Sequence, residues 1–261
     1  MVYENTIYNE DCLERLKKIE DNSIDLVVTD CPYHIVSGGC TTGPYGNECG
    51  GMFKKRTGYK ETGGYYLEGA KHIDLGGVLS DNEILYTKQG KLFKHNDIKF
   101  SDWLPDIYRV LKDGTHCYIF ISARNLKELQ VEAEKVGFKF QQLIVWDKGN
   151  TTPNKFYLNS YELILMLRKG KARNINNMGE KNIQRIKNIL GGKKTHPTEK
   201  PVELNKVFIE NSSNIGDVVL DPFMGTGSCG VACKELNRNF IGIEIDEKYF
   251  NIAKNKLKKE V

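Results

Sequence analysis

The sequence VVLDPFMGTGSCG at residues 218–230 predicts a buried strand, a glycine turn and the start of a helix. After that helix, FIGIEI at residues 240–245 predicts a second strand, parallel to the first. Gly225 and Gly227 allow a tight turn and let a ligand approach the backbone. Glu244 stands about twenty residues further on, where an acid can accept hydrogen bonds from ribose hydroxyls. The pattern favours an adenosine-containing cofactor; the alternative is an ordinary strand–helix turn with a surface acid.

Another strand, suited to the centre of a parallel sheet, is predicted at residues 24–29 and ends at Asp30-Cys31-Pro32-Tyr33. Open α/β sheets bind their ligands at the carboxyl ends of their strands. The tetrapeptide offers a carboxylate, a backbone carbonyl held in a fixed direction before proline, and an aromatic face. Asp30 and the Cys31 carbonyl can accept the two hydrogens of an exocyclic amine, while Tyr33 stacks on the ring. The alternative is a strand-ending turn that contains proline.

Hydrophobic periodicity and capping signals predict the remaining elements. Asp11 is expected to cap a short helix, with Glu14 completing a capping box. Asp113 and Gly114 are expected to end the helix that begins at residue 101. His116 lies on or beside a strand and is interpreted as structural. Further strands are predicted at residues 6–8, 116–122, 138–146 and 161–167, and further helices at residues 126–136, 228–236 and from Pro201, with proline at the first helical position.

The composition indicates a globular chain and predicts a cytoplasmic location. The 261 residues are 39% apolar and contain no run that could span a membrane and no signal-peptide pattern. Seven scattered cysteines fit a reducing compartment better than a disulfide scaffold. Cys40 and Cys49 form the one close pair in a loop, without a histidine at finger-like spacing, so no metal site is expected.

Positive charge is concentrated late in the chain. The window 168–200 holds ten basic and two acidic residues, a net charge of +8, whereas the whole chain carries +4. Such a segment suits a polyanion, and Lys193 and Lys194 are predicted to contact it; the alternative is a solvated basic loop.

Glycine is concentrated early in the chain. Residues 37–77 contain twelve of the 25 glycines, together with tyrosines and with Lys54, Lys55 and Arg56. This composition excludes one continuous helix or strand. The segment follows the tetrapeptide, so we expect an insertion, at about residues 37–99, that covers the tetrapeptide site and contacts unstacked bases and phosphates. The alternative is a disordered insertion without contacts.

Three motifs together resemble those of the β group of DNA amino-methyltransferases. Asp30-Cys31-Pro32-Tyr33 is similar to the D-P-P-Y catalytic motif, and the segment DPFMGTGS at residues 221–228 to the D-P-F-x-G-x-G motif for S-adenosylmethionine. THPTEKP at residues 195–201 resembles the H-x-T-x-K-P segment that precedes the cofactor motif. Cys31 departs from the family's proline; because its role is a main-chain carbonyl, the substitution should be tolerated.

The resemblance implies a fold, a reaction and a set of site residues. The fold is a single Rossmann-like α/β domain over residues 1–261, with about seven strands, a circularly permuted motif order and an antiparallel pair at one edge. The reaction transfers methyl from S-adenosylmethionine to the N6 amine of an adenine flipped from double-stranded DNA. The implied cofactor-binding residues are Asp11, Thr198, Lys200, Asp221, Phe223, Gly225, Gly227 and Glu244. The resemblance also leaves room for a homodimer and a restriction endonuclease partner.

Other functions remain open at this point. Cytosine-N4 is the second choice of target, because relatives that act on it more often begin the motif with serine. Cytosine-C5 chemistry would need a cysteine after proline, and here Cys31 precedes Pro32. A protein that binds DNA without turnover, and an RNA or protein amine substrate, are further alternatives.

Overall fold

One mixed sheet organises the part of the chain that the structure describes. The computed structural model describes residues 5–32, 58–60, 64–66, 98–152, 157–171, 173–189 and 199–259. Within these residues an eight-stranded sheet has the order β1-β10-β9-β2-β5-β7-β6-β8. In that order the strands are Thr6–Tyr8, Asn239–Ile243, Val218–Asp221, Ile24–Asp30, Leu111–Ile121, Asn159–Arg168, Lys139–Thr152 and Ile183–Arg185. The sequence predicted about seven strands; the eighth, β8, has three residues and no apolar run.

Strand direction changes at one side of the sheet. The strands β1, β10, β9, β2 and β5 are mutually parallel. Strand β7 runs antiparallel to β5 and to β6, which confirms the expected antiparallel pair. Because two reversals restore the direction, β6 and its parallel neighbour β8 run the same way as β5. The carboxyl ends of β2 and β6 therefore lie at the same edge of the sheet.

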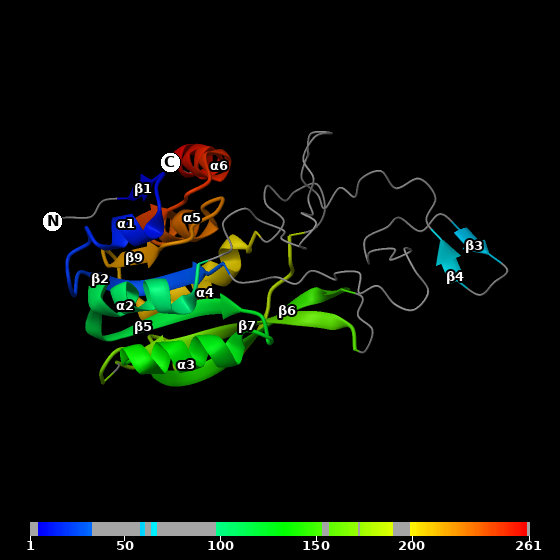
Figure 1. Cartoon of the computed structure of the whole chain (residues 1–261), viewed down its shortest axis with the longest axis horizontal. Helices are drawn as coiled ribbons and strands as arrows, with labels where there is room; N and C mark the ends of the chain where they lie inside the picture. Colours follow the sequence, from blue (N-terminus) through cyan, green and yellow to red (C-terminus); the bar gives the residue numbers. More distant parts are fainter. Residues whose placement is uncertain are drawn as a thin grey trace.

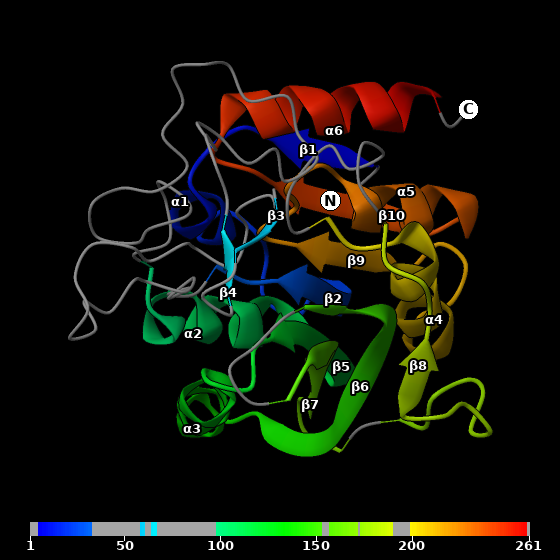
Figure 2. The same ribbon diagram turned by 90° about the vertical axis from the view of Figure 1, so that its right-hand side faces the viewer.

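Helices cover both faces of the sheet, as Figures 1 and 2 show. On one face lie α1 (Cys12–Leu16), α2 (Phe100–Val110) and α3 (Leu126–Val136), and on the other lie α4 (Val202–Ser212), α5 (Ser228–Glu235) and α6 (Glu247–Lys259). Alternate residues of the central strands enter the two cores: Val27 packs with the first group of helices, and Leu26 and Val28 pack with the second. Burial of β2 on both faces explains its apolar run at residues 26–28.

The two strands that carry the motifs are neighbours at a switch of the chain's winding. From β9 the chain continues through α5 to β10, whereas from β2 it reaches α2 and then β5 on the opposite side. The two connections use opposite faces of the sheet. Open α/β sheets form their ligand crevice at the carboxyl ends of two such strands. The fold thus places the predicted cofactor turn and the predicted catalytic tetrapeptide at one crevice.

Three local expectations were wrong in detail. Helix α2 ends at Val110 rather than at Gly114, because backbone N–H groups of Asn22 and Ser23 bond the carbonyls of its last residues. Pro201 is the residue before α4 and not its first helical residue. Asp11 caps α1 through the N–H of Leu13 at 2.8 Å, while the Glu14 carboxylate bonds Lys17 instead of completing a capping box.

The glycine-rich insertion is described only in part. Within it, β3 (Gly58–Lys60) and β4 (Gly64–Tyr66) pair as a two-stranded antiparallel sheet. Lys54, Lys55 and Arg56 lie outside the described residues. Among the helices that are described, none has the length and apolarity needed to cross a membrane.

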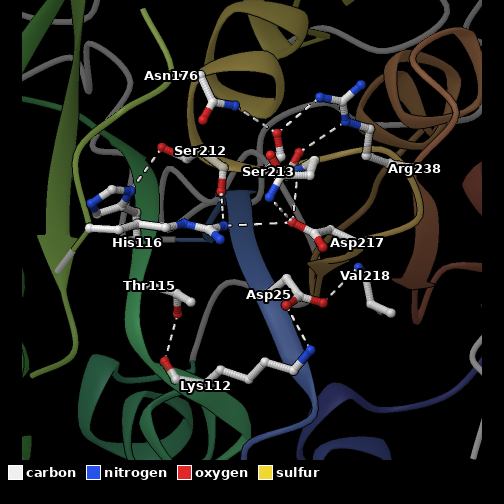
Figure 3. A network of polar contacts seen from close by, with 12 residues as sticks. Asp25, Lys112, Thr115, His116, Asn176, Ser212, Ser213, Asp217, Val218 and Arg238 are labelled. Atoms are coloured by element: carbon white, nitrogen blue, oxygen red, sulfur yellow. Dashed lines mark hydrogen bonds and ion pairs between the residues drawn. The ribbon is translucent and has the colours of Figure 1, made fainter. Parts of the chain in front are cut away.

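A polar network stabilises the amino edge of the sheet, opposite the crevice. His116 Nδ1 lies 2.9 Å from Ser212 Oγ, and Arg238 Nη2 donates to the Ser213 carbonyl at 2.9 Å (Figure 3). Burial, together with the nearby charge of Arg173, lowers the pKa of His116 to about 4. These contacts join the end of α4 to β5 and to the turn after α5, which supports the structural interpretation of His116.

Candidate active site

The glycine turn after β9 is built by two glycines with different surroundings. Gly225 and Gly227 have φ angles of +53° and +82°, which only glycine adopts without strain. A Cβ on Gly227 would lie 3.0 Å from the Cβ of Ala253 in α6, so this position also serves helix packing. A Cβ on Gly225 would meet no atom of the residues that the structure describes within 4 Å. Gly225 is therefore the position where a ligand can approach the backbone.

Glu244 directly follows β10 and is tied to the glycine turn. Its Oε2 accepts the N–H of Gly225 at 2.9 Å, and its Oε1 accepts the N–H of Asp246 at 2.8 Å. Burial raises the pKa of this carboxyl, and the two backbone donors oppose the shift. Each oxygen retains a second lone pair for a ribose hydroxyl. The residues fit the ribose half of S-adenosylmethionine.

Asp11 belongs to the same end of the crevice. Both Asp11 and Glu244 raise the pKa of the Cys12 thiol, which reaches about 12 chiefly through burial. Asp11 caps α1 with one oxygen and is exposed, so its other oxygen faces solvent or a ligand. The capping role is shown, and the cofactor role stays a prediction.

Asp221 and Phe223 hold the turn from inside. The Oδ1 of Asp221 accepts a hydrogen bond from the Thr29 hydroxyl at 2.7 Å and another from the N–H of Phe223 at 3.2 Å. Burial raises the pKa of Asp221 to about 7. The Phe223 ring packs edge-to-face on Trp103 of α2, with centroids 5.3 Å apart. These contacts are with protein groups, which favours a positioning role for both residues.

Asp30 ends β2, beside this turn. Its Oδ2 lies 2.6 Å from the Nζ of Lys200, and its side chain keeps a quarter of its surface exposed. Burial raises the pKa of Asp30, the Lys200 ammonium opposes that shift, and the Glu162 carboxylate adds to it. Within the described residues Lys200 contacts Oδ2, which leaves Oδ1 as an acceptor at the carboxyl edge of the sheet.

Cys31 turns away from the crevice. Its side chain is buried, its thiol donates to the Phe120 carbonyl at 3.8 Å, and burial raises its pKa well above the usual range. A buried neutral thiol is a poor nucleophile, which fits the expectation that only the main chain of Cys31 is used. Pro32 follows at the end of the described stretch, and Tyr33 lies outside it, as do Thr198, Lys193 and Lys194.

The structure adds two charged residues, Glu162 and Lys148, that sequence reasoning missed. The Nζ of Lys200 lies 3.1 Å from Glu162 Oε2, and Glu162 Oε1 lies 3.4 Å from the Nζ of Lys148. Glu162 lies on β7, directly before a buried apolar run. An acid in that position was the one sequence signal that could have indicated a functional residue here. Lys200, expected to bind the cofactor, contacts Asp30 here. Within the described residues, no group of three or more His, Cys, Asp or Glu side chains could hold a metal ion.

Comparison with known proteins identifies the family of the chain. The DNA methylase model of the N6/N4 methyltransferase family matches residues 24–255. The type II methyltransferase M.HpaI of Haemophilus parainfluenzae is 30% identical over 275 residues, which cover 95% of this chain and 72% of that protein. A crystal structure of M1.HpyAVI with S-adenosylmethionine is 25% identical and has a TM-score of 0.62, covering 97% of this chain and 99% of that one.

A further solved structure shows the fold alone. The cytosine-N4-specific PvuII DNA methyltransferase has a TM-score of 0.65 at 14% identity, and the match covers 99% of this chain and 93% of that one. The family model covers most of the chain, and its members use S-adenosylmethionine. The chain therefore belongs to the N6/N4 DNA methylase family and is a DNA methyltransferase.

Proposed function

We propose that this methyltransferase modifies the N6 amine of adenine in double-stranded DNA. The observation that carries the proposal is the position of Asp30: its carboxylate ends β2, one strand from the glycine turn, and keeps one oxygen clear of Lys200. An ionised acceptor suits an amine that must donate a hydrogen and then bear positive charge. The preference for adenine over cytosine-N4 comes from the aspartate that begins the tetrapeptide.

Each residue of the crevice has a defined task in this proposal. S-adenosylmethionine, when bound, supplies an electrophilic methyl group, and Gly225, Glu244 and Asp11 would hold its adenosine half. Asp30 and the Cys31 carbonyl accept the two amine hydrogens of a flipped base, which directs the nitrogen lone pair away from the ring. Asp30 then stabilises the charge that develops on nitrogen. Catalysis of this kind is mainly positioning and electrostatics.

A DNA-approach surface lies at the same edge as Asp30. We define it by the exposed basic residues Arg185 and Lys187 and the exposed side chains of Tyr157, Leu158 and Tyr161. Tyr161 is paired with Asp147, and Asp147 with Arg185, so the three side chains share one face of the sheet. In Figure 1 the β6–β7 pair extends beyond the helices. Basic and aromatic side chains on such an extension suit phosphates and unstacked bases.

The rest of the basic segment is less available to DNA at this edge. Lys169 is buried, and its Nζ bonds the carbonyls of Tyr108 and Leu111 at 2.8 and 2.6 Å, at the end of α2. Arg168 pairs with His116 in the sheet and so lies at the amino edge. The charge of the segment 168–200 is thus divided between two edges. A role for Lys193 and Lys194 stays a prediction.

Nucleoside mass spectrometry tests the proposal. Unmethylated DNA is incubated with the enzyme and S-adenosylmethionine and then digested to nucleosides. N6-methyladenine is the expected product. N4-methylcytosine would overturn the choice of base while keeping the site. Absence of any methylated nucleoside from several DNA sources, with cofactor binding confirmed separately, would favour an RNA substrate or a DNA-binding protein without turnover. A cytoplasmic location, a homodimer and a restriction endonuclease partner remain predictions.

A further inference from the structure

Four charged side chains alternate in sign across the crevice. Asp30 on β2, Lys200 before α4, Glu162 on β7 and Lys148 on β6 are joined in that order by N–O distances of 2.6, 3.1 and 3.4 Å. The side chains of Lys200 and Lys148 are only 9% and 11% exposed. Buried ammonium groups are costly unless acids compensate them. Glu162 is placed to compensate both lysines.

We propose that Glu162 and Lys148 are positioning residues that set the orientation and basicity of the Asp30 carboxylate through Lys200. Lys200 alone would fix Asp30 but would also make it a poor acceptor, because an adjacent ammonium withdraws its charge. Glu162 accepts from the same ammonium and offsets that effect. Lys148 in turn keeps Glu162 ionised. The inference rests on the proposed catalytic role of Asp30.

The charges around Glu162 and Asp30 support this arrangement. Burial disfavours ionisation of Glu162, but Lys200 and Lys148 outweigh it, so the pKa of Glu162 lies below its usual range. The groups that face Asp30 within the described residues are Lys200, Glu162 and, from β9, Asp221. Cys31 follows Asp30 in the chain and its thiol stays neutral. Lys200 Nζ also lies 5.4 Å from the ring centroid of Phe120, which further limits its movement.

Two substitutions give opposite shifts under this proposal. Glu162→Gln removes a negative charge, so the pKa of Asp30 falls and the acid limb of the kcat–pH profile moves to lower pH. Lys148→Gln removes a positive charge, so the pKa of Asp30 rises and the limb moves to higher pH. For unit charges about 6 Å apart at an effective dielectric constant of about 20, a shift of about two pH units is expected for Glu162→Gln, and a smaller one for the more distant Lys148→Gln. A role in stability alone would not produce opposite shifts.

The experiment measures kcat against pH for both variants and titrates the Asp30 carboxyl by carbon-13 NMR in each. Glu132→Gln is the matched control, because Glu132 pairs with Lys135 at 2.6 Å on the surface of α3 and should shift neither quantity. Two results would overturn the inference in variants that melt at the wild-type temperature. One is an unchanged acid limb of the kcat–pH profile together with an unchanged pKa of Asp30. The other is a shift of that pKa in the same direction in both variants.

The design separates this inference from the proposed function. A wild-type enzyme that methylates no amine refutes the proposed function, and the NMR titration of Asp30 still decides whether Glu162 and Lys148 control that carboxyl. If Glu162→Gln does not fold, Lys148→Gln tests the same coupling with the opposite expected sign.

Discussion

The Thr29 hydroxyl donates a 2.7 Å hydrogen bond to the buried carboxylate of Asp221. Thr29 precedes Asp30 on β2, and Asp221 ends β9 and starts the glycine turn. One hydrogen bond between neighbouring strands therefore couples the two motifs, although the two residues that form it are 192 positions apart in the chain. Such a contact fixes the distance between the proposed amine site and the cofactor turn more tightly than strand pairing alone.

Thr29→Val should weaken the fold and the coupling together. Valine keeps the shape of threonine but leaves the Asp221 Oδ1 with only the Phe223 N–H. A buried acceptor that loses a partner costs about 1–3 kcal/mol of unfolding free energy. Urea unfolding measures the loss, and Thr29→Ser, which keeps the hydroxyl, is the control. Equal stability of the valine variant and the wild type would show that Asp221 does not depend on this bond.

The two glycines of the turn should separate stability from cofactor binding. Gly227→Ala forces a left-handed residue against Ala253 and should lower the unfolding free energy by about 2–4 kcal/mol. Gly225→Ala should cost about 1–2 kcal/mol for the same backbone reason. Its methyl group, however, enters the open space beside the turn, and it should weaken S-adenosylmethionine binding at least tenfold.

Calorimetric titration with S-adenosylmethionine and thermal melting, performed on both alanine variants, check this difference. Gly227→Ala should bind the cofactor with near-normal affinity at temperatures where it is folded. A Gly225→Ala variant with unchanged affinity would place the cofactor away from this backbone position.

The sequence predicted the local elements and the crevice well, for reasons that these residues make plain. The apolar runs at residues 218–220 and 26–28 lie in largely buried strands, and Gly137, at φ +116°, ends α3 where predicted. Such signals depend on neighbouring residues. The family resemblance supplied the antiparallel pair, which no local pattern contains.

What sequence reasoning missed depends on contacts between distant segments. Glu162 is 132 positions from Asp30 in the printed sequence and approaches it only through the strand order β2-β5-β7, whereas Lys200, which was predicted to bind the cofactor, reaches Asp30 from the residues before α4. Sequence analysis included Lys169 in the basic segment that was expected to face a polyanion. In the structure its side chain is buried and donates hydrogen bonds to backbone carbonyls at the end of α2. Net charge in a window does not say which side chains remain exposed.

Asp30→Ala should abolish methyl transfer while sparing the cofactor. The substitution removes the acceptor for the amine and should lower kcat at least a hundredfold, the size of effect seen when one electrostatic contact to a transition state is lost. S-adenosylmethionine affinity should change little, because the proposed cofactor contacts lie on β10 and the glycine turn. Asp30→Asn keeps an acceptor oxygen and should retain more activity than alanine. Near-normal turnover of Asp30→Ala would refute the catalytic assignment.

The DNA-approach surface predicts a salt effect that depends on position as well as on charge. Arg185→Ala with Lys187→Ala removes two exposed cations at the edge that carries Asp30, and DNA affinity should fall. The slope of log K against log salt should become shallower by about 1.8, because each lost phosphate contact contributes about 0.9. Lys139→Ala with Lys171→Ala removes two exposed cations at the amino edge, where Lys139 pairs with Arg168 and the Lys171 carbonyl lies close to Gly114. That charge-matched control should leave the slope unchanged. Equal slopes for both double variants would show that net charge, and not this surface, guides the enzyme to DNA.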